Sequence, residues 1–214
     1  MLQRRQLLGR SAALVVAVAL PGMAAAPAGP ARPPLRAGAF IRVTADGQVT
    51  LVMCKAEMGQ GIHTAFAQLL AEELDVPLSQ VRVEHAPADD RLYGDATFGG
   101  LQVTGGSTSI RASWLVMRQA GADARQLLRL AAAQLWQVDV GRLASRDGRI
   151  VDTQHARGIG YGALVARAST LALPTGTPLK PASQFKLIGQ PQPRLDSRAK
   201  VQGRERFGID VRLA

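Results

Sequence analysis

The stretch Phe40-Ile-Arg-Val-Thr-Ala-Asp-Gly-Gln-Val-Thr-Leu-Val-Met53 decides the fold class. Apolar and polar residues alternate on both sides of Asp46-Gly47, as they do in two strands joined by a tight turn. Such a turn needs a positive φ, which this dipeptide accepts. The stretch therefore predicts a β-hairpin.

Helical patterning follows the hairpin in two places. Between Ile62 and Leu74 apolar residues recur on one broad face, and Asp75-Val-Pro77 ends that helix. A second helix opens at Thr104-Gly-Gly-Ser-Thr-Ser109 and runs to about Trp136 through residues that favour helices. The predicted fold class is α+β, with a β-hairpin and short strands packed with two main helices.

The other predicted elements are short. We expect strands at 81–85 and on both sides of the turn at 146–149, a helix at 161–168, and a further strand that begins at Phe207. Residues 87–106 form a long loop with glycines, and loops of this length in compact domains usually have a function.

Residues 1–28 have the composition of a targeting segment. Gln3-Arg-Arg-Gln-Leu-Leu8 places paired arginines ahead of a short apolar stretch, and Ala24-Ala-Ala26 offers a small-residue cleavage site. Paired arginines are typical of the twin-arginine export route, which predicts a periplasmic or cell-envelope location. An ordinary secretory leader and a retained membrane anchor remain alternatives. Residues 29–37 follow as a flexible linker.

The composition excludes several kinds of site and partner. Since Cys54 is the one cysteine, the chain forms no internal disulfide, no cysteine-ligated iron–sulfur cluster and no multi-cysteine zinc site. The net charge of +10 suggests nucleic acid at first, but the basic residues are scattered or lie in the leader and linker. We expect no nucleic-acid partner.

Two glycine loops, each placed just before a helix, are the candidate sites. The first glycine loop consists of Met58, Gly59, Gln60 and Gly61, and the second of Gly105, Gly106, Ser107, Thr108 and Ser109. A helix N-terminus presents free backbone N–H groups and the positive end of the dipole, which favour a phosphate. An ordinary turn at the first loop and plain helix capping at the second remain alternatives. Together the two loops favour an anionic ligand with extended phosphates.

Other polar residues are weaker candidates for a functional site. We expect the adjacent acids Glu72-Glu73 and Asp89-Asp90 on the solvated surface. His63 lies early in its helix, where it either reaches the rim of a pocket or is simply packed or solvated. His85 and His155 have no partners at ligand spacing.

Four stretches, in order along residues 38–212, carry a family resemblance. They are Glu57-Met-Gly-Gln-Gly-Ile-His-Thr-Ala-Phe-Ala-Gln-Leu-Leu-Ala-Glu-Glu-Leu74, Thr104-Gly-Gly-Ser-Thr-Ser-Ile-Arg-Ala-Ser-Trp114, Arg118-Gln-Ala-Gly-Ala-Asp-Ala-Arg125 and Lys200-Val-Gln-Gly-Arg-Glu-Arg-Phe-Gly-Ile-Asp-Val211. They resemble the molybdenum-binding large subunit of the xanthine dehydrogenase/aldehyde oxidase family, on the branch of the isoquinoline 1-oxidoreductase β subunit. The resemblance implies that both glycine loops approach a molybdopterin cytosine dinucleotide.

The resemblance also implies what kind of protein this chain belongs to. It predicts the N-terminal part of an oxidoreductase that hydroxylates an N-heterocycle or oxidises an aldehyde, with the rest of the large subunit and a separate iron–sulfur small subunit as partners. The family's catalytic glutamate lies near the far C-terminus, so we expect this chain to be inactive alone, and we predict no catalytic residue and no metal ligand in it. An exported, non-catalytic binding or assembly module is the alternative, and the membrane is a partner only through an uncleaved leader.

These predictions divide the chain into five parts. After the leader and linker, residues 38–170 form part of a molybdopterin-binding domain. Residues 171–199 form a Pro-rich linker, and residues 200–214 begin an α/β hammerhead domain.

Overall fold

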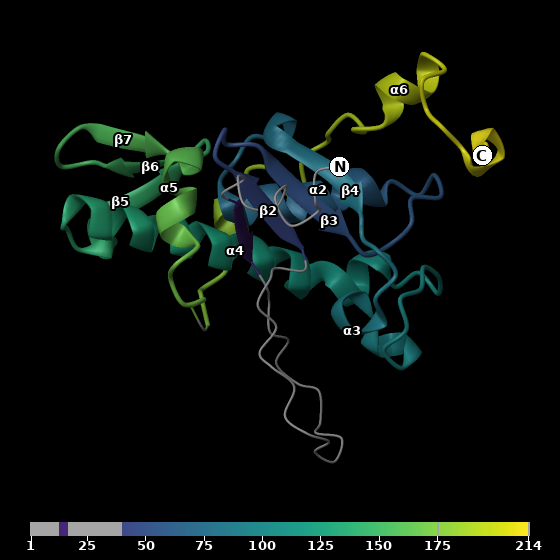
Figure 1. Ribbon diagram of the computed structural model, residues 1–214, viewed down its shortest axis with the longest axis horizontal. Coiled ribbons are helices and arrows are strands. Elements are labelled where there is room, and N and C mark those ends of the chain that lie inside the picture. The colour runs from purple at the N-terminus through teal and green to yellow at the C-terminus, as the bar shows by residue number, and fades with distance from the viewer. Residues whose placement is uncertain (1–12, 17–39, 175, 214) are drawn as a thin grey trace, which may run out of the picture.

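The predicted hairpin lies in the middle of a four-stranded sheet (Figure 1). The computed structural model describes residues 13–16, 40–174 and 176–213. Strand β2 (Ile41–Thr44) pairs antiparallel with β3 (Val49–Met53), and Gly47 in the turn between them has a φ of 84°. β4 (Val81–His85) adds to β3 in parallel, and β1 (Ala13–Val16) adds to β2 antiparallel. The hairpin prediction is confirmed.

Both main helices pack against this sheet and against each other (Figure 1). Helix α2 (Ile62–Leu74) has the predicted bounds, and α4 (Ser109–Trp136) ends where the sequence predicted. The alternation in the hairpin leaves Ile41, Val43 and Leu51 fully buried in the core. The α+β fold class is therefore confirmed.

Close contact between the two helices depends on Gly121 in α4. A Cβ at this position would lie 2.7 Å from the carbonyl oxygen of Leu70 and 2.8 Å from Cβ of Glu73, both on α2. These distances are shorter than atoms tolerate, so any larger residue would push the helices apart.

A second, three-stranded antiparallel sheet lies at the far end of α4 (Figure 1). It consists of β5 (Leu143–Arg146), β6 (Arg149–Asp152) and β7 (Arg157–Gly160), followed by helix α5 (Tyr161–Ala168). The hydroxyl of Tyr161 donates to the carbonyl of Leu74 at 2.7 Å, which ties α5 to the end of α2. The sequence predicted β5, β6 and α5 but missed β7.

The loop at 87–106 contains more regular structure than predicted. It includes helix α3 (Asp90–Tyr93) and a 3₁₀ turn at Ala96–Phe98. The carboxylate of Asp89 accepts from the N–H groups of Arg91 and Leu92 and so caps α3. Further 3₁₀ turns lie at Leu78–Gln80, Val140–Arg142 and Ala182–Gln184.

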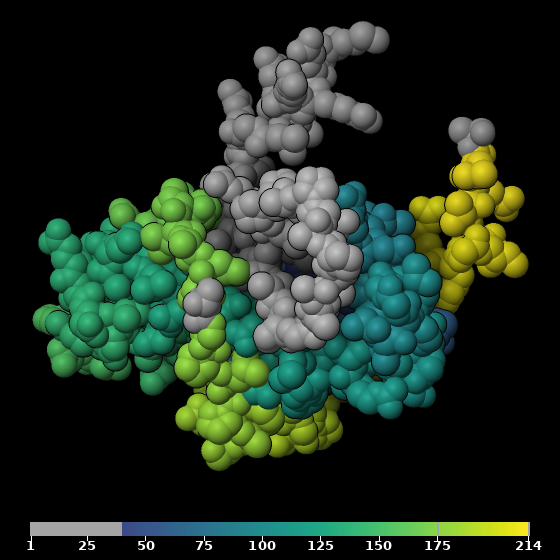
Figure 2. All heavy atoms as spheres, turned by 90° about the horizontal axis from the view of Figure 1, so that it is seen from below, coloured from purple at the N-terminus to yellow at the C-terminus, as the bar shows by residue number. Residues whose placement is uncertain are grey.

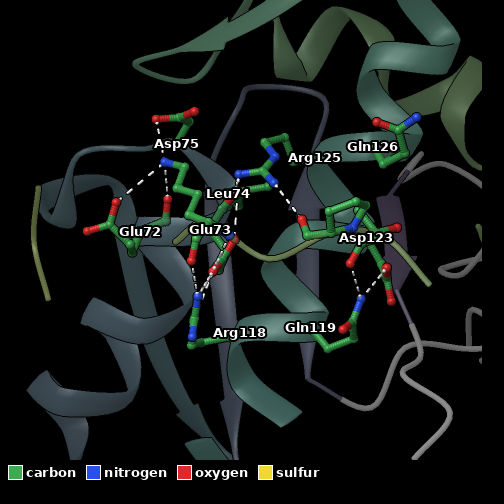
Figure 3. A network of polar contacts seen from close by, with 12 residues as sticks. Glu72, Glu73, Leu74, Asp75, Arg118, Gln119, Asp123, Arg125 and Gln126 are labelled. Carbon is green, nitrogen blue, oxygen red and sulfur yellow. Dashed lines mark hydrogen bonds and ion pairs between the residues drawn. The ribbon is translucent and has the colours of Figure 1, made fainter. Parts of the chain in front are cut away.

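The prediction that Glu72 and Glu73 lie on the solvated surface is wrong. Their exposed fractions are 2% and 0%. Figure 3 shows the cause: α2 turns these carboxylates toward cations from distant parts of the chain, such as Arg118, whose Nη2 lies 2.6 Å from Oε1 of Glu73. Burial of charge is tolerated here because the carboxylates are paired and hydrogen-bonded.

The predicted strand at Phe207 is wrong in this structure. The chain instead forms helix α6 (Ser197–Val201) and a 3₁₀ turn at Gly208–Asp210. The carboxylate of Asp210 accepts from the N–H of Phe207 at 2.9 Å, a local bond that favours a turn. Figure 2 shows these last residues standing clear of the body, where no described strand pairs with them.

Most of the predicted leader and the linker at 29–37 lie outside the described residues, although residues 13–16 of the leader form β1. None of the helices described is both long and apolar enough to cross a membrane.

Candidate functional site

The first glycine loop connects the end of β3 to α2, and its conformation is held by Glu57. Oε1 of Glu57 accepts from the N–H groups of Gly59 at 2.8 Å and Gly61 at 3.0 Å, and Oε2 accepts from His63 at 3.0 Å. Burial alone would raise the pKa of Glu57, but these backbone N–H groups and Arg194 lower it. The carboxylate of Glu57 thus places a negative charge at the N-terminus of α2.

Gln60 closes the same loop from the other side. Its Oε1 accepts from the N–H of Met58 at 2.5 Å, and its Nε2 donates to the carbonyl of Ala56 at 2.8 Å. Gly59 and Gly61 have φ values of 98° and 87°, and the side chain of Met58 is exposed. The first loop therefore presents its tip to solvent while most of its polar groups bond within the loop.

The second glycine loop differs because its donors are free. Gly106 and Ser107 are exposed and have φ values of 58° and 53°. Within the described part of the chain, the backbone N–H groups of Gly106, Ser107 and Ser109 have no hydrogen-bond acceptor, and neither do the two serine hydroxyls. The loop opens α4, a helix of 28 residues, so the dipole also favours an anion at this mouth.

A buried ion pair supports the second loop from behind. Nζ of Lys55 lies 2.5 Å from Oδ2 of Asp95, and the side chains are 2% and 1% exposed. The hydroxyl of Thr108 donates to the same Asp95 oxygen at 3.1 Å, so this member of the loop points inward. Burial raises the pKa of Asp95, but the bonds from Lys55 and Thr97 outweigh it and bring the pKa to about 2. The carboxylate is therefore charged at neutral pH.

Ala56 links the first glycine loop to Thr104, the residue directly before the second glycine loop. Its N–H donates to Oγ1 of Thr104 at 2.8 Å, while its carbonyl accepts from Gln60. A cavity of about 320 Å³ lies beside this junction, at the carboxyl ends of the parallel strands β3 and β4. It is lined by Cys54, Lys55, Ala56, His85, Gln102 and Thr104, among others. Ala56 and Thr104 lie just before the two loops in the chain, whereas none of the nine predicted loop residues is among those that line the cavity.

The sequence did not single out the residues that hold the loops. Lys55 and Asp95 are 40 residues apart, and neither belongs to a recognisable motif. The available signal was a lysine that directly follows the apolar run 49–54, where a buried cation requires a partner.

One other cluster has the composition of a metal site. Ligand atoms of Glu57, His63 and Asp196 lie within 4.8 Å of one another. Burial, followed by the neighbouring His85, lowers the pKa of His63, whose Nε2 is buried without a partner among the described residues. Arg194 and Lys200 already neutralise the carboxylate of Asp196, and Arg194 also pairs with Glu57. The side chains of Arg194 and Lys200 thus supply the positive charge that a metal ion would supply, and we assign no metal to this cluster.

Comparison with known proteins identifies the family to which the chain belongs. Residues 3–205 match the molybdopterin cofactor-binding domain family. The chain belongs to this family. The match covers both glycine loops, Lys55 and Asp95, and it confirms the family resemblance.

Two curated proteins and one solved structure are similar to parts of this chain. The chain is 33% identical to the isoquinoline 1-oxidoreductase β subunit of Brevundimonas diminuta, over 81% of this chain and 26% of that protein. It is also 33% identical to a membrane-bound aldehyde dehydrogenase (pyrroloquinoline-quinone) of Gluconacetobacter polyoxogenes, over 80% of this chain and 22% of that protein. Among solved structures, quinoline 2-oxidoreductase from Pseudomonas putida 86 aligns with a TM-score of 0.45 and 22% identity, over 64% of this chain and 17% of that one.

The chain therefore spans about a quarter of the length of the curated relatives that it matches. It corresponds to a molybdopterin-binding region of molybdenum hydroxylase large subunits.

Proposed function

We propose that this chain forms one wall of a molybdenum-cofactor pocket in the large subunit of a molybdenum hydroxylase, and that the second glycine loop binds the anionic part of the cofactor. The observation that carries the proposal is the set of free donors at Gly106, Ser107 and Ser109, presented at the N-terminus of a long helix. Phosphate and pterin oxygens are acceptors, so the donor set fits the cofactor.

The two loops would have different roles. Glu57 occupies the N–H groups of the first loop, so a phosphate there would be repelled by a carboxylate. We assign the anionic part of the cofactor to Ser107, Ser109 and the neighbouring residues of the second glycine loop. We assign to Met58 and Gln60 a contact with an uncharged part of the cofactor. The bound molybdenum cofactor supplies the redox chemistry, and the residues of this chain bind and orient it.

The form of the cofactor and the partners are part of the same proposal. We infer a molybdopterin cytosine dinucleotide, since the two loops, linked through Ala56 and Thr104, would offer donors to an extended, phosphate-bearing ligand. The partners would be the remainder of a large subunit and an iron–sulfur small subunit. The substrate would be an N-heterocycle or an aldehyde. Export by the twin-arginine route to the periplasm or cell envelope would follow from Arg4 and Arg5.

The proposal is tested by removing both free hydroxyls. In a Ser107→Gly/Ser109→Ala variant, glycine retains the left-handed conformation that position 107 adopts, so the loop is not strained. Molybdenum is measured by elemental analysis of the purified protein, and the nucleotide is measured as cytidine monophosphate released by acid. We expect both to fall together, while Ser79→Ala, at another exposed serine, leaves both unchanged. Wild-type content of both in the double variant would overturn the assignment of the second loop.

A further inference from the structure

A strap formed by residues 177–196 runs along α2 and is held by side chains one helical turn apart. Thr64, Gln68 and Glu72 lie on one face of α2 at i, i+4 spacing. Nε2 of Gln68 donates to the carbonyls of Leu187 at 3.1 Å and Gln190 at 3.2 Å. The strap is irregular apart from the 3₁₀ turn at Ala182–Gln184, and it bonds to the domain at several positions between Thr177 and Leu195.

The buried carboxylates of Glu72 and Glu73, which Figure 3 shows within their polar network, anchor the far end of the strap. Oε2 of Glu72 accepts from the N–H groups of Lys186, Leu187 and Ile188 at 2.7, 2.6 and 3.2 Å. Glu73 accepts from the N–H of Lys180, at 3.2 Å from Oε1 and 3.1 Å from Oε2. Because these are charge-assisted bonds in a buried place, the path of the strap along α2 is fixed.

Arg194 connects the strap to the first glycine loop. Its Nη1 donates to the carbonyl of Gly59 at 2.8 Å, and its Nη2 donates to Oε1 of Glu57 at 3.2 Å. Asp196 holds the guanidinium from behind, with Oδ1 2.9 Å from Nε and Oδ2 2.7 Å from Nη2. Next to it, the N–H of Leu195 donates to Oγ1 of Thr64 at 3.0 Å. One arginine thus contacts both the loop and the carboxylate that organises the loop.

We propose that Arg194 is a positioning residue for the cofactor site, through which the strap sets the conformation of the first glycine loop. Two residues of that loop have positive φ, and glycine there leaves the free loop many conformations. Glu57 selects one of them by accepting from three N–H groups, and Arg194 keeps that carboxylate charged and in place. The inference rests on the proposed function, since it assumes that the loop contributes to cofactor binding.

The test measures amide hydrogen exchange and molybdenum content in the complete large subunit that contains these residues. In Arg194→Gln we expect the N–H groups of Gly59, Gly61 and His63 to exchange about tenfold faster or more, because their acceptor Glu57 loses the guanidinium that holds its carboxylate in place. The N–H groups inside α2 should keep their protection, and molybdenum content should fall. Arg198→Gln, at an exposed arginine on α6 with no side-chain partner among the described residues, is the matched control.

A second variant separates positioning from loss of folding. Arg194→Lys keeps the charge, but a single ammonium does not reproduce the planar fork that reaches Gly59 and Glu57 together. Exchange at the loop and molybdenum content should be intermediate.

Two outcomes would overturn the inference. One is unchanged loop exchange in both variants, which would leave the proposed function intact. The other is faster loop exchange with full molybdenum content, which would show that the conformation of the first loop does not matter for cofactor binding. The proposed function itself fails separately, in the Ser107→Gly/Ser109→Ala variant.

Discussion

Replacement of Lys55 by Met should destabilise the domain far more than loss of an ordinary surface ion pair. Met has a similar length and no charge, so the change removes the ammonium and leaves most of the packing. Asp95 would remain 5% exposed without its cation, and only Thr97 and Thr108 would still donate to it. A carboxylate in this position must either stay charged at high cost or take up a proton.

The expected cost follows from the burial of both partners. Breaking a buried ion pair by removing one member costs about 3–5 kcal/mol, whereas an exposed pair contributes about 0–1 kcal/mol. Lys55 and Asp95 are almost fully buried, whereas the side chains of Arg42 and Glu84, which pair across the sheet, are 39% and 52% exposed. Arg42→Met is therefore a matched control with an expected loss below about 1 kcal/mol.

The assay is urea denaturation, followed by circular dichroism, with molybdenum content measured on the same samples. In Lys55→Met we expect a large loss of the free energy of unfolding and reduced molybdenum, because Thr108 and the second glycine loop lose their support. The double variant Lys55→Met/Asp95→Asn should recover more than half of the stability, since no unpaired charge remains buried. If Lys55→Met lost no more than Arg42→Met, the buried pair would not be the support that we infer.

Three further predictions test other parts of the structure. Glu73→Gln should lower the free energy of unfolding by about 3–5 kcal/mol, because Arg118 would lose its buried counter-charge. The exposed Glu84→Gln should lower it by under about 1 kcal/mol. Urea denaturation compares the two variants, and equal losses would contradict the assignment. Gly121→Ala should cost about 1–3 kcal/mol by forcing α2 and α4 apart, while Gly160→Ala, where an added Cβ meets nothing within 4 Å, should be nearly neutral in thermal denaturation. The midpoint of thermal unfolding should be steady above about pH 5 and fall between about pH 5 and 2, because the folded-state pKa values of Asp95 and Asp152 lie at about 2, below that of an unfolded aspartate. Burial raises both pKa values, but hydrogen bonds from Lys55 to Asp95 and from His155 to Asp152 outweigh it, so a midpoint that stays constant through this range would refute the pairings.

Local patterns allowed the helices and the hairpin to be predicted from the sequence. The bounds of α2 follow from apolar residues at helical spacing and from the Pro77 that stops it, and the hairpin follows from alternation around Asp46-Gly47. Both signals lie within the element itself. The candidate loops were predicted for the same reason, since glycines before a helix are a local feature.

The residues that fix the loops are not local. Glu73 is buried by Arg118, 45 residues away, and by the N–H of Lys180, 107 residues away. The general preference of acidic residues for the surface therefore gave the wrong environment for it. The strand predicted at Phe207 failed for a related reason, because alternation predicts a strand only where another strand is present to pair with it.

Three consecutive residues join the two glycine loops. Lys55 holds the second loop through Asp95, and Glu57 holds the first loop and the strap. Between them, the backbone of Ala56 bonds to Gln60 of the first loop and to Thr104 beside the second loop. Since Lys55 and Arg194 act on different loops through different carboxylates, their effects on stability should be nearly independent. Both loops nevertheless face the same proposed ligand, so either change alone should lower its retention. If the effects of the Lys55 and Arg194 variants add in the free energy of unfolding but not in molybdenum content, the two loops interact only through the cofactor. If the effects are non-additive in both quantities, Ala56 transmits the change within the protein.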